Sequence, residues 1–305
     1  MQQEFIHWLL DSTIPSIRYI TLRDLLGRAK TDAGVQAAKQ AIMAQGPVPA
    51  IFAAQTDNGS WAREHSYYTP KYVSTHWSML LLTELEVEGS DPRFQRGLDY
   101  MLDATVPQLK QPGESNLDIA CFWGNLLRYA AHGKRLDDPR VKAIIPHLIW
   151  DIEHHESRCK HNAQLPCAWG VARVLWSLAV LPVPTPETAS AIETGLTMLL
   201  DSYQLVEANY PTSGHPHALW SKLSFPLFYQ VDILFVLRTL ADLHALHRPG
   251  AQAALHWLEA QRQADGHWQG TSPFRQRTWK ALAARGDTDR WVSLQAALVL
   301  QQVQH

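Results

Sequence analysis

Apolar residues recur at intervals of three and four along nearly the whole chain, which is the spacing of amphipathic helices. Within residues 14–26, for example, Ile17, Ile20, Leu22 and Leu25 fall close to one helical face. Strand signals, such as an Asn-Gly turn between two alternating runs, are almost absent. The breaks between helical segments are short and rich in Gly, Pro and Asp, and none is long enough to separate two domains. We therefore expect an all-α fold with residues 1–305 in a single domain.

Three tryptophans mark an internal repeat. Trp77, Trp123 and Trp169 are spaced 46 residues apart, and each begins a predicted helix of similar pattern. Two looser copies follow at intervals of 62 and 60 residues, and one precedes them near the front of the chain. The first copy (18–22) and the last copy (290–294) are the most alike. The six reference positions are Tyr19, Trp77, Trp123, Trp169, Val231 and Trp291.

The two ends of this array suggest how it is arranged in space. A repeat array either stays an open solenoid with polar end caps or closes on itself. Both end helices, 17–26 and 292–300, are apolar, which is unfavourable for a cap that faces solvent. Closure would bury both of them. We therefore predict an α/α toroid with six inner helices, among them the Trp-bearing ones, and about six outer helices. An open solenoid is the alternative.

Two segments share a Gln…Gly-x-Trp pattern, residues 54–61 (Ala-Gln-Thr-Asp-Asn-Gly-Ser-Trp) and residues 257–268, which end in Asp-Gly-His-Trp. Both resemble the repeat of squalene and oxidosqualene cyclases, which is found also in the β subunits of protein prenyltransferases. The resemblance implies that these segments are structural staples between outer helices. Residues 68–72, 166–170 and 225–229 also resemble segments of small bacterial squalene-cyclase-like proteins with a single toroid. The resemblance to these proteins covers the whole chain.

The chain departs from that family where the chemistry of its members resides. The Asp-x-Asp-Asp acid motif of class II cyclases is absent, because the segment Leu136-Asp137-Asp138-Pro139 lacks the first Asp of that motif. We find neither an Asp-rich magnesium motif nor the Asp-x-Cys zinc pair of the prenyltransferase β subunits. Standard squalene cyclisation is therefore not expected, and the resemblance supports the fold more than the reaction.

Composition excludes several classes of partner. The chain is 46 % hydrophobic and 18 % charged, with a formal net charge of −2, so we expect neither nucleic acid nor an anionic membrane as a partner. We expect no secretory leader and no membrane anchor, since no apolar run is long enough. Three cysteines are an odd number, which argues against a disulfide framework and favours reduced thiols in the cytoplasm. The oligomeric state is left open.

Cysteines occupy matching positions in two successive copies of the repeat. Cys121 and Cys167 each lie two residues before the reference Trp, so we expect them to be neighbours. Cys159 and His161 could fold back beside them. These four residues suggest a zinc site, because thiolate and imidazole are ligands that suit zinc. Alternatively, thiols with a lowered pKa at helix N-termini could shuttle protons, or the cysteines could be small buried hydrophobes.

Asp232 is the strongest candidate for a catalytic carboxylate. It lies between two strongly apolar segments, 225–231 and 233–237, where a carboxyl group could act as a general acid. The structural alternative is an ion pair with an interior arginine, for which the candidates are Arg18, Arg128 and Arg173. We expect Asp289 to be only a helix N-cap.

Twelve tryptophans either fill an aromatic core or form the walls of a cavity. In the second case the tryptophans would stabilise positive charge on a substrate by cation–π contact. Further residues near the cavity mouth would also contact the substrate. We therefore predict an enzyme, a cyclase, isomerase or lyase, that acts on a small hydrophobic and isoprenoid ligand. The alternatives are a lipid-binding protein without turnover and a structural toroid with a filled core. The predicted substrate contacts are Trp77, Trp123, Trp169, Trp291, Tyr229, Tyr68, Lys71 and His76.

Overall fold

The computed structural model describes residues 3–114, 119–209, 216–282 and 285–303. These residues form helices joined by loops, and their extended pairing is limited to three isolated β-bridges, with no strand among them. The all-α prediction is therefore confirmed. Within the same residues, no helix is both long enough and apolar enough to cross a membrane.

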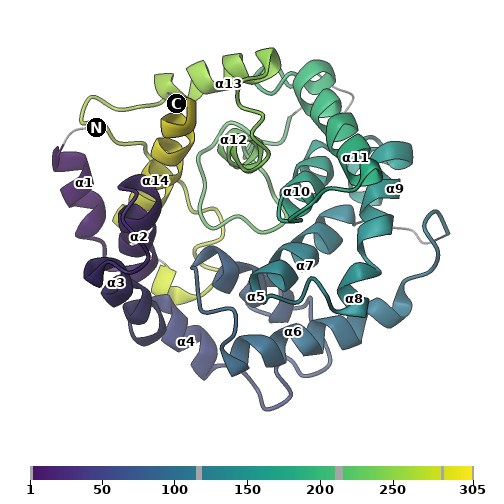
Figure 1. The fold of residues 1–305 in the computed structure, drawn as a ribbon, viewed down its shortest axis with the longest axis horizontal. Helices are drawn as coiled ribbons and strands as arrows, with labels where there is room; N and C mark the ends of the chain where they lie inside the picture. Colours follow the sequence, from purple (N-terminus) through teal and green to yellow (C-terminus); the bar gives the residue numbers. More distant parts are fainter. Residues whose placement is uncertain (1–2, 115–118, 210–215, 283–284, 304–305) are drawn as a thin grey trace. The chain divides into compact units, whose positions relative to one another are not determined.

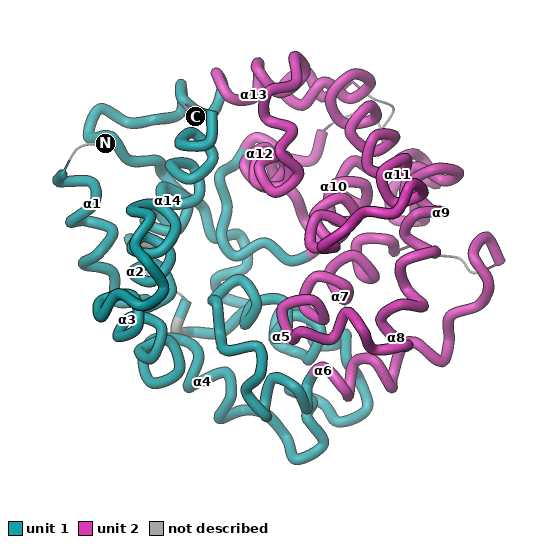
Figure 2. The backbone as a smooth tube through the Cα atoms, viewed as in Figure 1, with its two compact units in different colours: residues 1–97, 222–228, 257–305 teal, residues 98–221, 229–256 magenta. Residues whose placement is uncertain are grey.

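The chain folds as two compact units, each built from segments that are far apart in the sequence (Figure 2). Unit 1 contains residues 1–97, 222–228 and 257–305, and unit 2 contains residues 98–221 and 229–256. Two of the boundaries fall inside helices, α6 (Pro92–Thr105) and α13 (Pro249–Ala260), rather than in linkers. The single toroidal domain stays a prediction.

Unit 1 holds both ends of the chain. Its further helical elements are α1 (Gln3–Leu10), α2 (Pro15–Ile20), η1 (Thr21–Leu25), α3 (Ala33–Ala44), α4 (Pro47–Ala53), α5 (Thr75–Glu84), η5 (Lys280–Leu282) and α14 (Arg285–Val303). The sequence determines several starts locally, since Pro15 and Pro47 occupy the first turns of α2 and α4. The Asp32 side chain likewise caps α3 by accepting the N–H of Val35 at 3.1 Å.

The first and last copies of the repeat lie side by side in unit 1. Helix α14 packs against α1, α2 and η1 (Figure 1). The hydroxyl groups of Ser12 and Thr13 donate to the carboxylate of Asp287 at 3.2 and 2.9 Å, and Arg290 Nε donates to the Trp8 carbonyl at 2.8 Å. The predicted association of the apolar ends is therefore observed, although the full ring of six copies stays a prediction.

One expectation about α14 is wrong. This helix begins at Arg285, so Asp289 lies inside it and is not its N-cap. Its carboxylate instead accepts the backbone N–H of Gly270 at 2.7 Å and thereby fixes a distant loop. The sequence suggested a cap because Gly286 resembles a helix break, but glycine is tolerated near a helix start.

Each Gln…Gly-x-Trp segment forms a turn that we term a staple, in which the Trp side chain bonds back to the preceding helix. The Trp61 indole N–H donates to the Ile51 carbonyl at 2.7 Å, and Trp268 does the same to Leu258 at 2.8 Å, in each case ten residues back. Gln55 Nε2 donates to the Gly59 carbonyl at 3.0 Å. In the second staple Arg262 takes the place of Gln55, because its Nε donates to the Gly266 carbonyl at 3.1 Å.

Unit 2 contains the middle copies of the repeat. Its helical elements, besides parts of α6 and α13, are η2 (Val106–Gln108), α7 (Ala120–His132), α8 (Pro139–Lys142), α9 (Ile145–His155), η3 (Lys160–Asn162), α10 (Ala168–Leu178), α11 (Pro186–Thr197), η4 (Met198–Tyr203) and α12 (Ile233–Asp242). Helices α7 and α10, which begin at the paired cysteines, pack closely together. A Cβ atom on Gly124 of α7 would lie only 2.7 Å from the Arg173 carbonyl oxygen of α10.

Replacing Gly124 by alanine should therefore destabilise the protein by about 1–3 kcal/mol, the usual cost of overpacking. The clash is with backbone, so no side chain can rotate away to relieve it. Urea unfolding measures the change. Gly286→Ala is the matched control, because its nearest atom would be the flexible end of Arg290 at 3.8 Å. Equal stability of the two variants would contradict the close α7–α10 contact.

Candidate active site

Three cysteines from separate segments of unit 2 form what we term the thiol cluster, Cys121, Cys159 and Cys167. Cys121 lies in the first turn of α7, Cys167 is the N-cap residue of α10, and Cys159 precedes η3. The three lie close enough that negative charge on Cys159 or Cys167 raises the pKa of Cys121. The structure thus brings together Cys121 and Cys167, as the repeat register predicts, with Cys159 beside them.

Burial keeps two of these thiols protonated. It raises the pKa of Cys121 to about 12 and that of Cys167 to about 11. Arg173 opposes the rise at Cys121, and the N–H groups of Gly170 and Trp169 oppose it at Cys167, but desolvation exceeds both effects. Both cysteine residues keep some solvent-accessible surface. The protein that surrounds each thiol nevertheless makes its ionised form less favourable than it is in water. The expectation of a lowered thiol pKa at helix N-termini is therefore wrong for these two residues.

Because Cys121 and Cys167 are protonated, we expect their thiols to be alkylated slowly. Only the thiolate reacts, so in a Cys159→Ser background the rate of iodoacetamide labelling at Cys121 and Cys167 should rise about tenfold per pH unit from pH 7 to 9 without levelling off. The urea-unfolded chain should level off near the ordinary thiol pKa of about 8.5. A plateau near pH 8 in the folded protein would contradict the raised pKa values.

A buried carboxylate lies beside the thiol cluster. Asp151 of α9 is fully buried, and its two oxygens contact Ser157 Oγ at 2.6 Å and His155 Nδ1 at 3.4 Å. Its charge contributes to the raised pKa of Cys167. No motif in the sequence marks this Asp–His pair. Its only signal was the spacing of four residues on one predicted helix, which places two side chains on the same face.

A pocket of about 410 Å³ opens next to Cys167, between α9, α10 and the continuous helix α11–η4. Ile152, Val171 and Met198 form an apolar floor, and all three are buried. Cys167 is not itself a lining residue, but its backbone N–H donates to the carbonyl of Glu156, which is one, at 3.1 Å. The hydroxyl groups around the pocket belong to Ser190, Thr194, Thr197 and Ser202.

Three partly exposed rings form an aromatic group near the start of α10. Trp169 lies edge-on to His217 with ring centroids 4.7 Å apart, and to Tyr229 at 6.2 Å. Trp169 and Tyr229 were predicted as substrate contacts, whereas His217 was not. His215, which forms a sequence pair with His217, lies outside the described residues.

The other predicted tryptophans pack mainly as core. Trp77 is fully buried in unit 1, and so is Trp291, which stacks on Phe225 at 4.1 Å. Trp123 in unit 2 is 8 % exposed and lies edge-on to Phe122 at 5.2 Å. For these three residues the packing agrees with the alternative of an aromatic core. Their contact with a substrate stays a prediction.

The remaining predicted contacts form one group in unit 1. The ring of Tyr68 packs edge-on against Trp77 at 4.7 Å and lies 6.1 Å from the buried ring of His76. Lys71 Nζ lies over the Tyr68 ring at 5.7 Å. Lys71 and Tyr68 keep partial exposure, so they are accessible to a ligand, and their role stays a prediction.

Asp232 is buried and caps α12 by accepting the N–H of Phe235 at 2.8 Å. The candidate partners among the arginines have other contacts. Arg128 pairs with Asp242 at 3.0 Å, Arg18 donates to the Ser12 carbonyl, and Arg173 donates to the Gln230 carbonyl at 2.6 Å. The role of Asp232 as a general acid stays a prediction.

The thiol cluster does not form a ready metal site. Among the described residues, no three His, Cys, Asp or Glu side chains are placed to hold a metal ion. His161 is exposed on η3. Zinc held by Cys121, Cys159, Cys167 and His161 stays a prediction from the sequence.

Searches among known protein families, characterised proteins and solved structures gave no match for this chain.

Proposed function

We propose that this chain is an isomerase or lyase that transfers a proton on a small hydrophobic substrate, with Cys121 and Cys167 as the proton-transferring groups. The observation that supports this proposal is the pair of protonated thiols at the adjoining starts of α7 and α10. The sequence resemblance to squalene-cyclase-like proteins favours an isoprenoid substrate. The pocket beside Cys167 combines buried apolar side chains with hydroxyl groups and the carboxylates of Glu156 and Glu193, which suits a molecule with an apolar body and an uncharged hydroxyl end.

The thiol pKa values favour isomerisation or elimination over cyclisation. A group with a pKa of about 11 is a weak acid, matched to a carbon or oxygen atom that becomes strongly basic during the reaction. Protonating an isolated alkene, as class II cyclases do, needs a far stronger acid. In the proposed reaction, the Cys167 thiol gives its proton to such a substrate atom. The Cys167 thiolate then takes the proton of Cys121 while Cys121 takes a proton from a neighbouring substrate carbon, so both thiols are restored as the double bond shifts or water leaves.

Product analysis in deuterated water tests the proposal. Purified protein is incubated with prenyl alcohols and prenyl diphosphates, and mass spectrometry detects converted product and deuterium incorporated at carbon. We expect turnover by the wild type and a loss of about 10²- to 10⁴-fold in kcat/KM for Cys121→Ala and Cys167→Ala. Val183→Ala, at a side chain that is 79 % exposed, is the control variant. Saturable binding without conversion would instead identify a binding protein.

Cys159→Ala separates the thiol pair from the zinc hypothesis. If Cys121 and Cys167 act without a metal, Cys159→Ala should keep activity within a few-fold, and a chelator-free preparation should contain no stoichiometric zinc. If zinc is bound, Cys159→Ala should lower both metal content and activity.

A further inference from the structure

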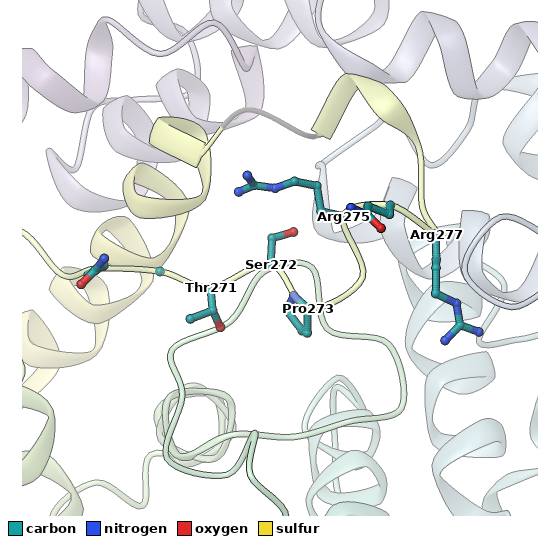
Figure 3. Close-up of a pocket in the computed structure, with 8 residues that line it drawn as sticks. Thr271, Ser272, Pro273, Arg275 and Arg277 are labelled. Carbon is teal, nitrogen blue, oxygen red and sulfur yellow. The ribbon is translucent and has the colours of Figure 1, made fainter.

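A second pocket lies wholly within unit 1, in the loop between the second staple and η5. It has a volume of about 560 Å³ and is lined by residues 269–273 and 275–277 (Figure 3). None of these lining residues is acidic, and two of them, Arg275 and Arg277, carry positive charge. The other polar lining groups are hydroxyls and carboxamides, from Thr271, Ser272, Gln269 and Gln276.

The loop is fixed at several points, so the pocket does not depend on a ligand for its shape. Gly270 N–H donates to the Asp289 carboxylate at 2.7 Å. Thr271 exchanges backbone hydrogen bonds with Leu223 and Phe225 at 2.7 and 2.9 Å. Beyond the pocket, the Thr278 hydroxyl donates to the Tyr72 carbonyl at 3.1 Å. Such pinning lowers the entropy cost of binding, because the loop is already ordered.

Two buried polar atoms in this pocket have no hydrogen-bond partner among the described residues, Arg275 Nε and Ser272 Oγ. The two residues belong to one turn, in which the backbone N–H of Arg275 donates to the backbone carbonyl of Ser272 at 3.3 Å. Figure 3 shows the Arg275 side chain on the same side of the loop as the Ser272 hydroxyl, with Arg277 turned another way. A buried donor without a partner is costly, so such groups in proteins normally serve a ligand or an ordered water.

We propose that this pocket binds a phosphate group, either free phosphate or the phosphate of a small organic ester. A guanidinium fork and a hydroxyl are donors that match the terminal oxygens of phosphate, and no carboxylate in the lining repels the anion. Phosphate can use more of the converging donors than a carboxylate can, because it presents three or four oxygens. Arg277, whose guanidinium lies 4.8 Å from the centre of the Tyr72 ring, adds positive charge at the exposed rim. This site does not depend on the thiol chemistry proposed for unit 2.

Calorimetric titration of the full chain tests the site, with inorganic phosphate and ethyl phosphate as probes and sodium chloride at equal ionic strength as the reference. We expect saturable binding, weakened about tenfold or more in Arg275→Gln and several-fold in Ser272→Ala. Arg275→Lys should lie between Arg275→Gln and the wild type, since it keeps the charge but loses the fork. Arg63→Gln, at an exposed arginine of unit 1, should bind as the wild type does.

The two probes distinguish the source of the phosphate. Tighter binding of ethyl phosphate indicates an ester ligand, and tighter binding of inorganic phosphate indicates the free ion. The proposal is overturned if neither probe saturates, or if Arg275→Gln, shown by circular dichroism to be folded, binds as tightly as Arg63→Gln.

Discussion

Trp61→Ala should lower the free energy of unfolding by about 3–5 kcal/mol, the range for deleting a large buried aromatic side chain. Trp61 is fully buried, and Gly97 packs so closely that a Cβ there would lie 2.7 Å from the indole ring. The substitution also leaves the Ile51 carbonyl without its 2.7 Å donor. Urea unfolding followed by far-ultraviolet circular dichroism measures the loss.

Two companion variants separate the contributions to this loss. Trp61→Phe keeps most of the buried ring but removes the N–H donor, so it should cost about 1–3 kcal/mol. Val183→Ala, at a largely exposed side chain, should stay within about 0.5 kcal/mol of the wild type. A Trp61→Ala variant as stable as Val183→Ala would show that the staple does not hold unit 1 together.

Arg173→Met should cost about 3 kcal/mol, which is the second large effect that we expect. The guanidinium is fully buried, donates to the Gln230 carbonyl at 2.6 Å and lies 3.9 Å from the centre of the Phe235 ring. Methionine fills much of the volume, so the cost arises mainly from the lost charged hydrogen bond and the carbonyl left behind.

The same variant has a readout at the thiol cluster. Arg173 lowers the pKa of Cys121, so its removal should raise that pKa further and slow the alkylation of Cys121 at pH 8 to 9. Arg63→Met, at an exposed arginine, should change neither stability nor labelling. Faster alkylation of Cys121 in folded Arg173→Met would contradict the assigned electrostatic effect.

The structure also qualifies the staple pattern that was found in the sequence. The pattern contains Gln, and in the second segment Gln261 and Gln263 both lie near the expected position. In three dimensions Arg262 makes the equivalent bond, because any side chain with an N–H that reaches the turn carbonyl four residues later can serve. A pattern defined by residue type could not identify this substitution, whereas the geometry does.

The pattern of apolar residues and the internal repeats predicted the all-α fold, the Trp residues of the two Gln…Gly-x-Trp segments, the contact between the terminal copies and the proximity of Cys121 and Cys167. These features follow from periodicity and internal repetition, which are properties of the linear chain. Three features could not be predicted from the sequence: Cys121 and Cys167 are protonated, Asp151 holds His155 and Ser157, and Arg275 and Ser272 share a pocket. They depend on burial and on hydrogen-bond partners, because distant segments of the chain supply the surroundings of each group.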